Sequence, residues 1–389
     1  MKRAINILLL LCFSLPGFGQ SFSHLMQSIE QNNTQLITLQ KWLNAEKTKA
    51  KTGTYPENPE VTYNHLWSGP DLPGNQKELE ITQSFKWPGY YTSKSAIQEL
   101  NYQQKEALAE KEKREILHNA RSVYFHLVWL NKQEALLKTR KKDGEQLVAI
   151  MQEGFERGEI SKPAFDKARI YNIGVQTEWQ KTQSEIKVQR QYLRQLNGGH
   201  SIDHLIYEYP LEWKLPDLDS LLINLADSHP DLTMAQLGLK QSEKEVSHQK
   251  MNRLPTFAAG YRSESFMDQN LKGFHVGISI PLWQNTNKVK QARLQIDWAA
   301  ARLTQQEGEL ERRASNLFHQ AATLQNNFQQ MKAVMEEEQV SQSHLELLKA
   351  GQISFSEYLT DVRFIQETWM QFLETEYTYY ELLSQLNRY

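Results

Sequence analysis

The stretch that decides the fold is residues 77–87, which read KELEITQSFKW. Apolar side chains fill alternate positions here except at Gln83, and residues 272–282, KGFHVGISIPL, repeat the pattern. A period of two predicts β-strands with one apolar face. The apolar positions, which we expect to face lipid, are Leu79, Ile81, Phe85 and Trp87 in the first stretch and Phe274, Val276, Ile278, Ile280 and Leu282 in the second.

Each stretch has a preceding partner, at 60–68 and 256–265, so the sequence predicts two β-hairpins. Their loops are expected at 69–76 and 266–271, the first of which contains two prolines and two glycines. Strands of about 9–11 residues with aromatic ends are typical of outer-membrane β-barrels. The same alternation also suits a half-buried sheet in a soluble protein, and the strand pattern alone does not separate the two.

Long polar helices flank these hairpins. Residues 92–155 and 287–350 contain no proline, and a helix of roughly 64 residues would extend about 95 Å. The chain is only 40% hydrophobic, with a mean hydropathy of -0.63. Such helices suit coiled-coil or helical-barrel packing, in which a narrow apolar stripe suffices. The predicted fold class is therefore mainly α with a small β portion.

The sequence contains two copies of one plan. Leu36 matches Leu232 at an offset of 196 residues, and Gly158-Glu159-Ile160-Ser161 matches Gly351-Gln352-Ile353-Ser354 at an offset of 193. Each copy is expected to run helix, two strands, long helix, shorter helix. We place the first repeat at 20–199, a linker at 200–216 and the second repeat at 217–389.

The N-terminus has the three parts of an export signal, expected at 1–19. Lys2 and Arg3 precede an apolar run, and Gly17-Phe18-Gly19 supplies a small-x-small cleavage pattern. The alternative is a buried N-terminal strand. Cys12, the only cysteine, lies inside this run. A lipoprotein signal needs a small residue before its cysteine, and Leu11 is not small. Because cleavage of the signal removes Cys12, the mature chain is expected to form no disulfide.

Export and the hairpins together predict an oligomer in the outer membrane. Four strands cannot close a lipid-spanning barrel, because about eight are needed and no edge can stay open in lipid. Three chains would supply 12 strands and would bring their long helices into one tube, so a homotrimer is expected. With 44 basic against 46 acidic residues, nothing in the charge suggests nucleic acid.

These features resemble the TolC outer-membrane efflux family, and within it the heavy-metal branch typified by CzcC and CusC. The resemblance rests on the duplicated plan, on Asn58-Pro59-Glu60-Val61, on Phe85-Lys86-Trp87-Pro88-Gly89 and on the two Gly-x-Ile-Ser turns. It implies a trimer whose 12-stranded barrel continues into a periplasmic α-helical barrel. It also implies a periplasmic adaptor (membrane fusion) protein and an inner-membrane pump of the resistance-nodulation-division type as partners, with the chain as their passive exit duct.

The two matching turns each combine a glycine that ends a helix with a serine that caps the next one. Local chemistry describes them as helix-hairpin turns and nothing more. The resemblance adds that they form the periplasmic tip that meets the adaptor. The residues concerned are Arg157, Gly158, Ile160 and Ser161 in the first turn and Gly351, Ile353 and Ser354 in the second.

Acidic residues follow both turns. Glu357 and Asp361 are four residues apart, on one helix face, and Asp166 lies at a comparable place after the first turn. The resemblance implies that such carboxylates line the closed end of the tube; Glu357 matches by position, whereas Asp361 is shifted by one residue. Three copies around an axis would attract cations. The alternative is that they are solvated charges on an outer face.

No phosphate-binding loop, nucleophile elbow or Cys/His metal spacing occurs in the sequence. We therefore expect no enzyme activity, no cofactor and no resident metal. The second functional interpretation is a periplasmic coiled-coil adaptor or scaffold, which would form neither an integral membrane fraction nor a trimeric pore.

Overall fold

The structure is a computed structural model of the 389-residue chain. It describes residues 18–388 except 68, 70–73, 203–205, 207, 211–212, 268 and 338–339, so the predicted signal at 1–19 lies almost wholly outside the described residues. The chain divides into two compact units. Unit 1 comprises Met1–Ile37, Arg114–Ser220 and Ala314–Tyr389, and unit 2 comprises Thr38–Lys113 and Leu221–Arg313. Each unit draws segments from both predicted repeats.

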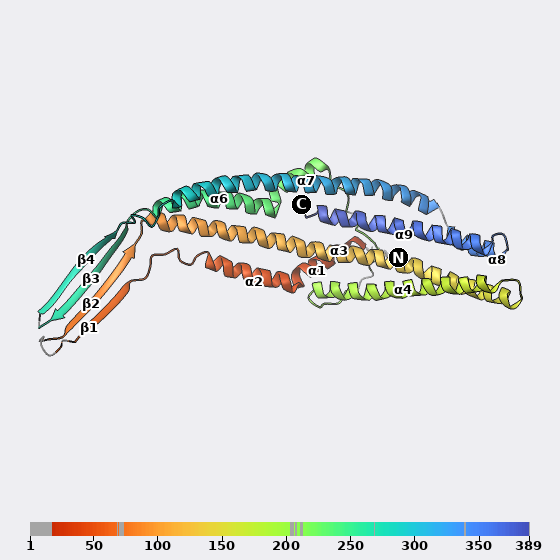
Figure 1. Cartoon of the computed structure of the whole chain (residues 1–389), viewed down its shortest axis with the longest axis horizontal. Helices are drawn as coiled ribbons and strands as arrows, with labels where there is room; N and C mark the ends of the chain where they lie inside the picture. The colour runs from red at the N-terminus through yellow and green to blue at the C-terminus, as the bar shows by residue number, and fades with distance from the viewer. Residues whose placement is uncertain are drawn as a thin grey trace, which may run out of the picture. The chain divides into compact units, whose positions relative to one another are not determined.

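The predicted fold class is confirmed: the described chain is mostly helical and contains one small antiparallel sheet (Figure 1). The helices are α1 (Phe18–Asn32), α2 (Thr34–Lys49), α3 (Pro88–Glu156), α4 (Lys162–Leu196), α5 (Leu218–Ser228), α6 (Pro230–Met251), α7 (Lys288–Glu337), α8 (Val340–Lys349) and α9 (Phe355–Leu386). The strands are β1 (Glu60–Leu66), β2 (Gln76–Phe85), β3 (Thr256–Phe266) and β4 (Gln269–Ser279).

The four strands lie in unit 2 and form one sheet in the order β1-β2-β3-β4. All three pairings are antiparallel, and the central one joins the two predicted hairpins by pairing Ile81 of β2 with Tyr261 of β3. Tyr261 in turn pairs with Phe274 of β4. This register places the apolar positions of β2 and β4 on the same face of the sheet, because side chains alternate strictly between faces.

The strand ends differ from the sequence expectation. β4 ends at Ser279, so Ile280 and Leu282 lie beyond it, because Pro281 has no N–H to donate to the ladder. β2 likewise ends at Phe85 and leaves Trp87 outside, since Pro88 begins α3. The β3–β4 connection is also shorter than the predicted loop at 266–271: β3 extends to Phe266 and β4 begins at Gln269.

The first predicted long helix is a single helix, α3, of 69 residues. The second is described as α7, of 50 residues, and α8, of 10 residues, and residues 338–339 between them lie outside the described residues.

The helical segment before each hairpin is interrupted, and the two interruptions lie at matching positions. Asn33 ends α1 and caps α2, where its Oδ1 accepts from the backbone N–H of Gln35 at 2.9 Å. His229, 196 residues later, separates α5 from α6, and its Nδ1 accepts from the N–H of Asp231 at 3.2 Å. A side chain that satisfies free N–H groups favours a new helix start. The sequence predicts one helix over 23–53, and the break at Asn33 shows that this prediction is wrong. In the second copy the sequence predicts that a helical segment opens at His229, and α6 begins there.

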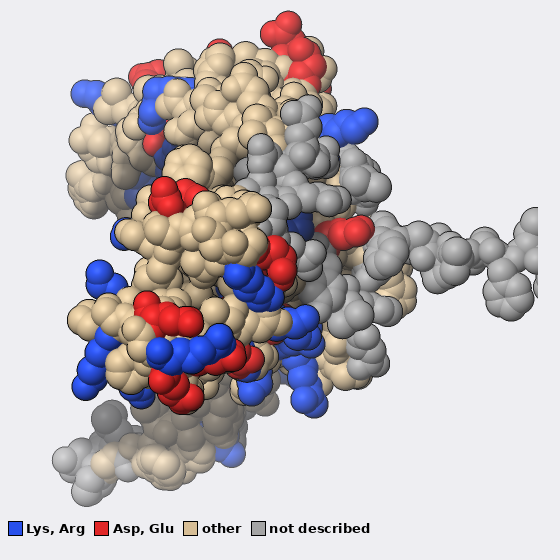
Figure 2. Space-filling view, turned by 90° about the vertical axis from the view of Figure 1, so that its right-hand side faces the viewer, with Lys and Arg blue, Asp and Glu red and all other residues tan. Residues whose placement is uncertain are grey.

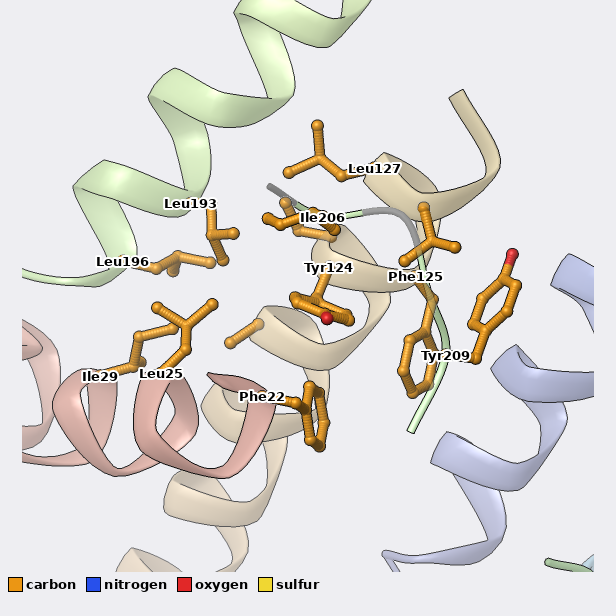
Figure 3. Packing of buried hydrophobic residues seen from close by; sticks show 13 residues of the cluster. Phe22, Leu25, Ile29, Tyr124, Phe125, Leu127, Leu193, Leu196, Ile206 and Tyr209 are labelled. Atoms are coloured by element: carbon orange, nitrogen blue, oxygen red, sulfur yellow. The ribbon is translucent and has the colours of Figure 1, made fainter. Parts of the chain in front are cut away.

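The main apolar core belongs to unit 1, where four segments converge around Phe125 (Figure 3). Phe22, Leu25 and Ile29 come from α1, Leu193 and Leu196 from α4, and Ile206 and Tyr209 from the segment after α4. Phe125 and Ile29 are fully buried. The aromatic rings meet mostly edge to face, as for Phe22 and Tyr124 at 4.9 Å between ring centroids. This core fixes α3 and α4 where they continue toward the turn that joins them.

Candidate functional sites in the sheet and the helical turns

One face of the sheet is apolar and exposed. Phe274 is 90% exposed and Val276 is 87% exposed, and Val61, Tyr63 and Ile278 on the same face are more than half exposed. Leu79, Ile81 and Phe85 are also exposed. Beyond the strand ends, Trp87, Ile280 and Leu282 are exposed too. Exposed apolar surface of this extent marks a contact with a partner or with lipid. We call this surface the apolar face.

The opposite face is polar and internally connected. Arg262 lies 2.6 Å from Glu78 and 3.6 Å from Glu264, and the Nε2 atom of His275 lies 3.4 Å from Glu80. Gly260 makes room for this arrangement, because a Cβ atom there would lie 2.3 Å from the His275 ring. We call this surface the polar face. The sequence shows its residues at the alternate positions of the strands but gives no sign of their pairing.

The sheet has two open edges. β1 and β4 are its outer strands, and each pairs with one neighbour in the described chain. An open edge leaves a row of backbone N–H and C=O groups without partners. In water such groups are hydrated, but within lipid each would cost several kcal/mol, which excludes an isolated four-stranded sheet from a membrane.

The two predicted turns lie in unit 1 and share one backbone design. Gly158 has a φ of 76° and Gly351 a φ of 67°, the left-handed conformation that only glycine adopts without strain. The N–H of Glu159 donates to the carbonyl of Gly154, and the N–H of Gln352 donates to that of Leu347, both at 2.9 Å. Each turn therefore ends its helix with a Schellman motif.

The two serines behave differently. Ser354 forms a complete capping box with Glu357 at the start of α9. Ser161 is the N-cap of α4 by its backbone, but its side chain makes no capping hydrogen bond. Pro163 explains part of this difference, since it removes one of the N–H groups that a cap would satisfy. The prediction of a serine cap is confirmed in the second turn and is wrong in the first.

Apolar packing joins the two hairpins below their turns. Leu147, Met151 and Ala168 from the first hairpin form one cluster with Leu345 and Tyr358 from the second. Ile160 and Ile353, the isoleucines of the two turns, pack against this cluster. Gly154 adds to the fit, because a Cβ atom there would lie 2.6 Å from Ile160 Cδ1. The Gly-x-Ile-Ser pattern therefore places one glycine in a left-handed conformation and one isoleucine in the shared core.

The acidic gate candidates are not gathered by the single chain. Glu357 is exposed and hydrogen-bonded to the Ser354 backbone, which lowers the pKa of its carboxyl. Asp361 lies 3.7 Å from His344 of α8, and Asp166 lies 4.0 Å from Arg169 on its own helix. Glu357 and Asp361 share a helix, whereas Asp166 belongs to the other hairpin. Any ring of these carboxylates would have to be made by several chains.

Arg140 of α3 is a residue near the turns that sequence reasoning missed. Its side chain is 9% exposed, its Nη2 donates to the Tyr171 hydroxyl at 3.2 Å, and its Nη1 lies 4.0 Å from Glu178. It lines an open pocket of about 820 Å³ together with residues of α4 and α9. Burial also raises the pKa of Asp143, one turn further along α3. An arginine in a polar helical stretch carries no sequence signal of burial.

The end of unit 1 that carries the turns has a mixed charge (Figure 2). Lys and Arg side chains are interspersed with Asp and Glu among the described residues of this face. Arg157 illustrates the pattern, because it pairs with Glu153 one helical turn earlier. Mixed, exposed charge of this kind suits recognition of a polar protein surface more than binding to nucleic acid.

The described residues contain neither a cluster of metal ligands nor a membrane-spanning helix. No group of three or more His, Cys, Asp or Glu side chains is placed to hold a metal ion among them. Among the helices described, none combines the length and the apolar character that a membrane-spanning helix needs.

The chain resembles known proteins in its structure rather than in its sequence. No protein-family model matches the chain, and no curated protein is similar to it in sequence. Solved structures do match. CusC, whose structures concern folding and transmembrane channel formation, is 15% identical over 95% of this chain and 92% of its own, with a TM-score of 0.79. A membrane protein from Pseudomonas aeruginosa is 14% identical over 95% and 89%, with a TM-score of 0.80.

The outer membrane protein VceC from Vibrio cholerae is 14% identical over 94% of this chain and 95% of its own, with a TM-score of 0.76. The chain has the fold of an outer-membrane channel. At these identities the likeness concerns the fold, and it extends over nearly the whole of both chains. The similar structures are channels and membrane proteins, not enzymes.

Proposed function

We propose that this channel-fold chain is the outer-membrane exit duct of a tripartite efflux system. The observation that carries the proposal is the sheet, whose apolar face is exposed and whose two edges are open. Such a sheet is stable in lipid only when its edges are paired, and further copies of the chain supply the missing strands. Three copies give 12 strands.

In this assembly the apolar face meets lipid and the polar face lines the pore. The strands join polar helices at one end of the sheet, which we assign to the periplasmic side. The six helical turns of a trimer would then form the ring that docks a periplasmic adaptor, behind which an inner-membrane pump supplies the energy. The duct itself needs no nucleotide, since it only offers a wetted route outward.

The proposed gate residues are Glu357, Asp361 and Asp166. All three follow a turn by a few residues, and the hydrogen bonds from Ser354 lower the pKa of the Glu357 carboxyl, which favours its charged form. Three copies of α9 around an axis would bring Glu357 and Asp361 together as a cation-attracting constriction. A narrower form of the proposal is that the cargo consists of heavy-metal cations. This assignment rests on the Asn58-Pro59-Glu60 motif alone.

Fractionation with crosslinking tests the duct directly. The full chain, exported in a Gram-negative host, is expected in the outer-membrane fraction as a crosslinked trimer, and the purified trimer is expected to give single-channel currents in planar bilayers. A soluble periplasmic monomer would refute the duct and favour a coiled-coil adaptor or scaffold. For the cargo, loss of the chain from its native host is expected to sensitise cells to metal salts; sensitivity to organic drugs only would remove the metal assignment and leave the duct intact.

A further inference from the structure

Every acidic residue of the paired strands lies on the polar face of the sheet. Within the paired strands, the carboxylates of Glu60, Glu78, Glu80 and Glu264 all fall on the polar face. Lys77 of β2 and Lys272 of β4 fall on the apolar face, where the strands carry no acidic residue. A lysine on the face that carries the exposed apolar side chains needs an explanation, since positions beside acidic groups are available on the other face.

The two lysines lie together at the loop end of the apolar face. Lys272 is in register with Ser263 and Leu79, and Lys77 is in the next row toward the loops, in register with Ser265. Lys77 and Lys272 are two strands and one row apart, so their Cα atoms are separated by roughly 12 Å. The rows on the helix side of them carry Ile81, Phe274 and other apolar residues.

Neither amine has a partner within the described chain. Both lysines are exposed, and neither forms an ion pair with a described residue. Arg262 on the polar face shows the contrast, because it contacts two glutamates. At the helix end of the sheet, Lys86 is also engaged, with Asn252 at 3.5 Å and above the Tyr90 ring at 4.0 Å. Free cations on the sheet's apolar side are thus confined to the loop end.

We propose that Lys77 and Lys272 bind the phosphate groups of lipid in the outer leaflet of the outer membrane. This inference rests on the proposed function, because it requires the sheet to span the membrane with its loops outward. A lysine at the edge of an apolar belt extends its amine into the headgroup layer while its methylene groups stay in contact with lipid tails. Trp67, which is 78% exposed and stacked on His65, lies just beyond β1 at this level, where aromatic rings favour the interface.

The chemistry favours a lipid over a soluble anion. A soluble ligand is held in a pocket by groups that converge, whereas these lysines stand apart on an open apolar surface. Two phosphate groups carried by one glycolipid headgroup would match two amines spaced in this way, and its acyl chains would cover the apolar rows beneath. The ligand that fits this surface is therefore a phosphate-bearing glycolipid of the lipid A type.

Lipid binding to the purified, detergent-solubilised full chain tests the inference. Native mass spectrometry with diphosphorylated lipid A and with its dephosphorylated form compares three proteins: wild type, the Lys77→Gln/Lys272→Gln variant, and a control variant Lys181→Gln/Lys187→Gln. The control removes two exposed lysines from α4, outside the sheet. Wild type and control are expected to prefer the phosphorylated lipid, and the sheet variant is expected to bind it roughly thirtyfold more weakly.

Three outcomes separate the inference from the proposed function. Equal binding of the two lipids by the wild type, or an unchanged preference in the sheet variant, overturns the lipid site. If the protein still floats with phosphatidylcholine vesicles and gives channel currents in that case, the duct survives. If it neither floats nor conducts in any lipid, the proposed function is wrong, and the lipid site, which depends on it, is wrong as well.

Discussion

Glu357 Oε2 accepts a hydrogen bond from the backbone N–H of Ser354 at 2.8 Å, and the Ser354 hydroxyl accepts one from the N–H of Glu357 at 3.2 Å. The residue proposed as a gate is therefore also half of the capping box that begins α9. A mutation of Glu357 would change two things at once, the charge of the proposed gate and the start of the helix. Variants that separate these effects decide which of them matters.

The variant Glu357→Gln/Asp361→Asn removes both charges and keeps an oxygen that can accept the Ser354 N–H. We expect single-channel cation selectivity to fall, on the order of tenfold, because three chains lose six carboxylates at the constriction. Thermal stability should stay near that of the wild type. Bilayer recordings in a salt gradient measure the selectivity, and an unchanged reversal potential would remove both residues from the gate.

Ser354→Ala is the matched variant for the capping role. It keeps both charges but loses the hydroxyl, so α9 should be destabilised by about 1 kcal/mol with little change in selectivity. Ser161→Ala, at the equivalent position of the other turn, should cost less, since the Ser161 side chain makes no capping bond. Thermal unfolding followed by circular dichroism compares the two, and an equal loss in both would contradict the difference seen between the turns.

His118 should make unit 1 sensitive to acid. Burial lowers the pKa of His118 to about 4, helped by Arg388 and Arg121, and its Nδ1 lies 2.8 Å from the Ser384 hydroxyl. The unfolded chain, in which the pKa is about 6.5, takes up a proton that the folded chain refuses. The stabilisation is thus complete above pH 6.5 and is lost as the pH falls toward 4. Between pH 7 and pH 5 we expect a loss of about 1–2 kcal/mol, reduced from the full linkage value because the group is partly solvated.

Denaturant titrations at several pH values measure this loss. His118→Gln keeps a hydrogen-bonding side chain that does not titrate, so its stability should depend less steeply on pH than that of the wild type. Burial also lowers the pKa of His126, which leaves a smaller residual slope in the variant. A slope identical in both proteins would show that His118 is solvated or already protonated in the folded chain.

Much of the fold could be predicted from short-range patterns. The alternation in 77–87 reflects a sheet with two unlike faces, and the absence of proline over 92–155 reflects α3. Both signals are local, so one sequence suffices to show them. The break at Asn33 was missed because one residue can either continue a helix or cap the next, and the choice depends on contacts made elsewhere. Asn33, for example, also donates to the carbonyl of Leu196, 163 residues away.

The site could be predicted only in part, for the same reason. The sequence alone indicates that Gly158 and Gly351 end their helices, because the positive φ of such a turn favours glycine. The burial of Arg140 and the ladder of Glu78, Arg262 and Glu264 depend on which helix or strand lies alongside, and no pattern within one segment reports that. The proposed ring of gate carboxylates depends on contacts between chains, since other copies would have to complete it.

The Lys132–Glu376 ion pair joins α3 to α9 in unit 1, and its removal is expected to destabilise that unit. Lys132 Nζ lies 2.6 and 2.8 Å from the two carboxylate oxygens of Glu376, which is 8% exposed. Glu376→Leu should cost about 3 kcal/mol, because it leaves the Lys132 charge half-buried without its partner. Lys132→Met/Glu376→Leu should recover most of that loss, and chemical denaturation of the three proteins measures it. Equal stability of the single and double variants would show that the pair is screened by solvent.

Gly260 should be indispensable for the sheet, and Gly277 is its matched control. Both lie on the polar face, but a Cβ atom at Gly260 would lie 2.4 Å from the backbone oxygen of Ile81, whereas one at Gly277 would meet only the Ala258 side chain, at 3.6 Å. Gly260→Ala must therefore displace a paired strand or expel His275, while Gly277→Ala makes an ordinary contact. We expect Gly260→Ala to lower the fraction of chain recovered as a crosslinked outer-membrane trimer several-fold, and Gly277→Ala to leave it unchanged. Equal recovery of the two variants would mean that the tight packing of His275 over β3 does not limit assembly of the sheet.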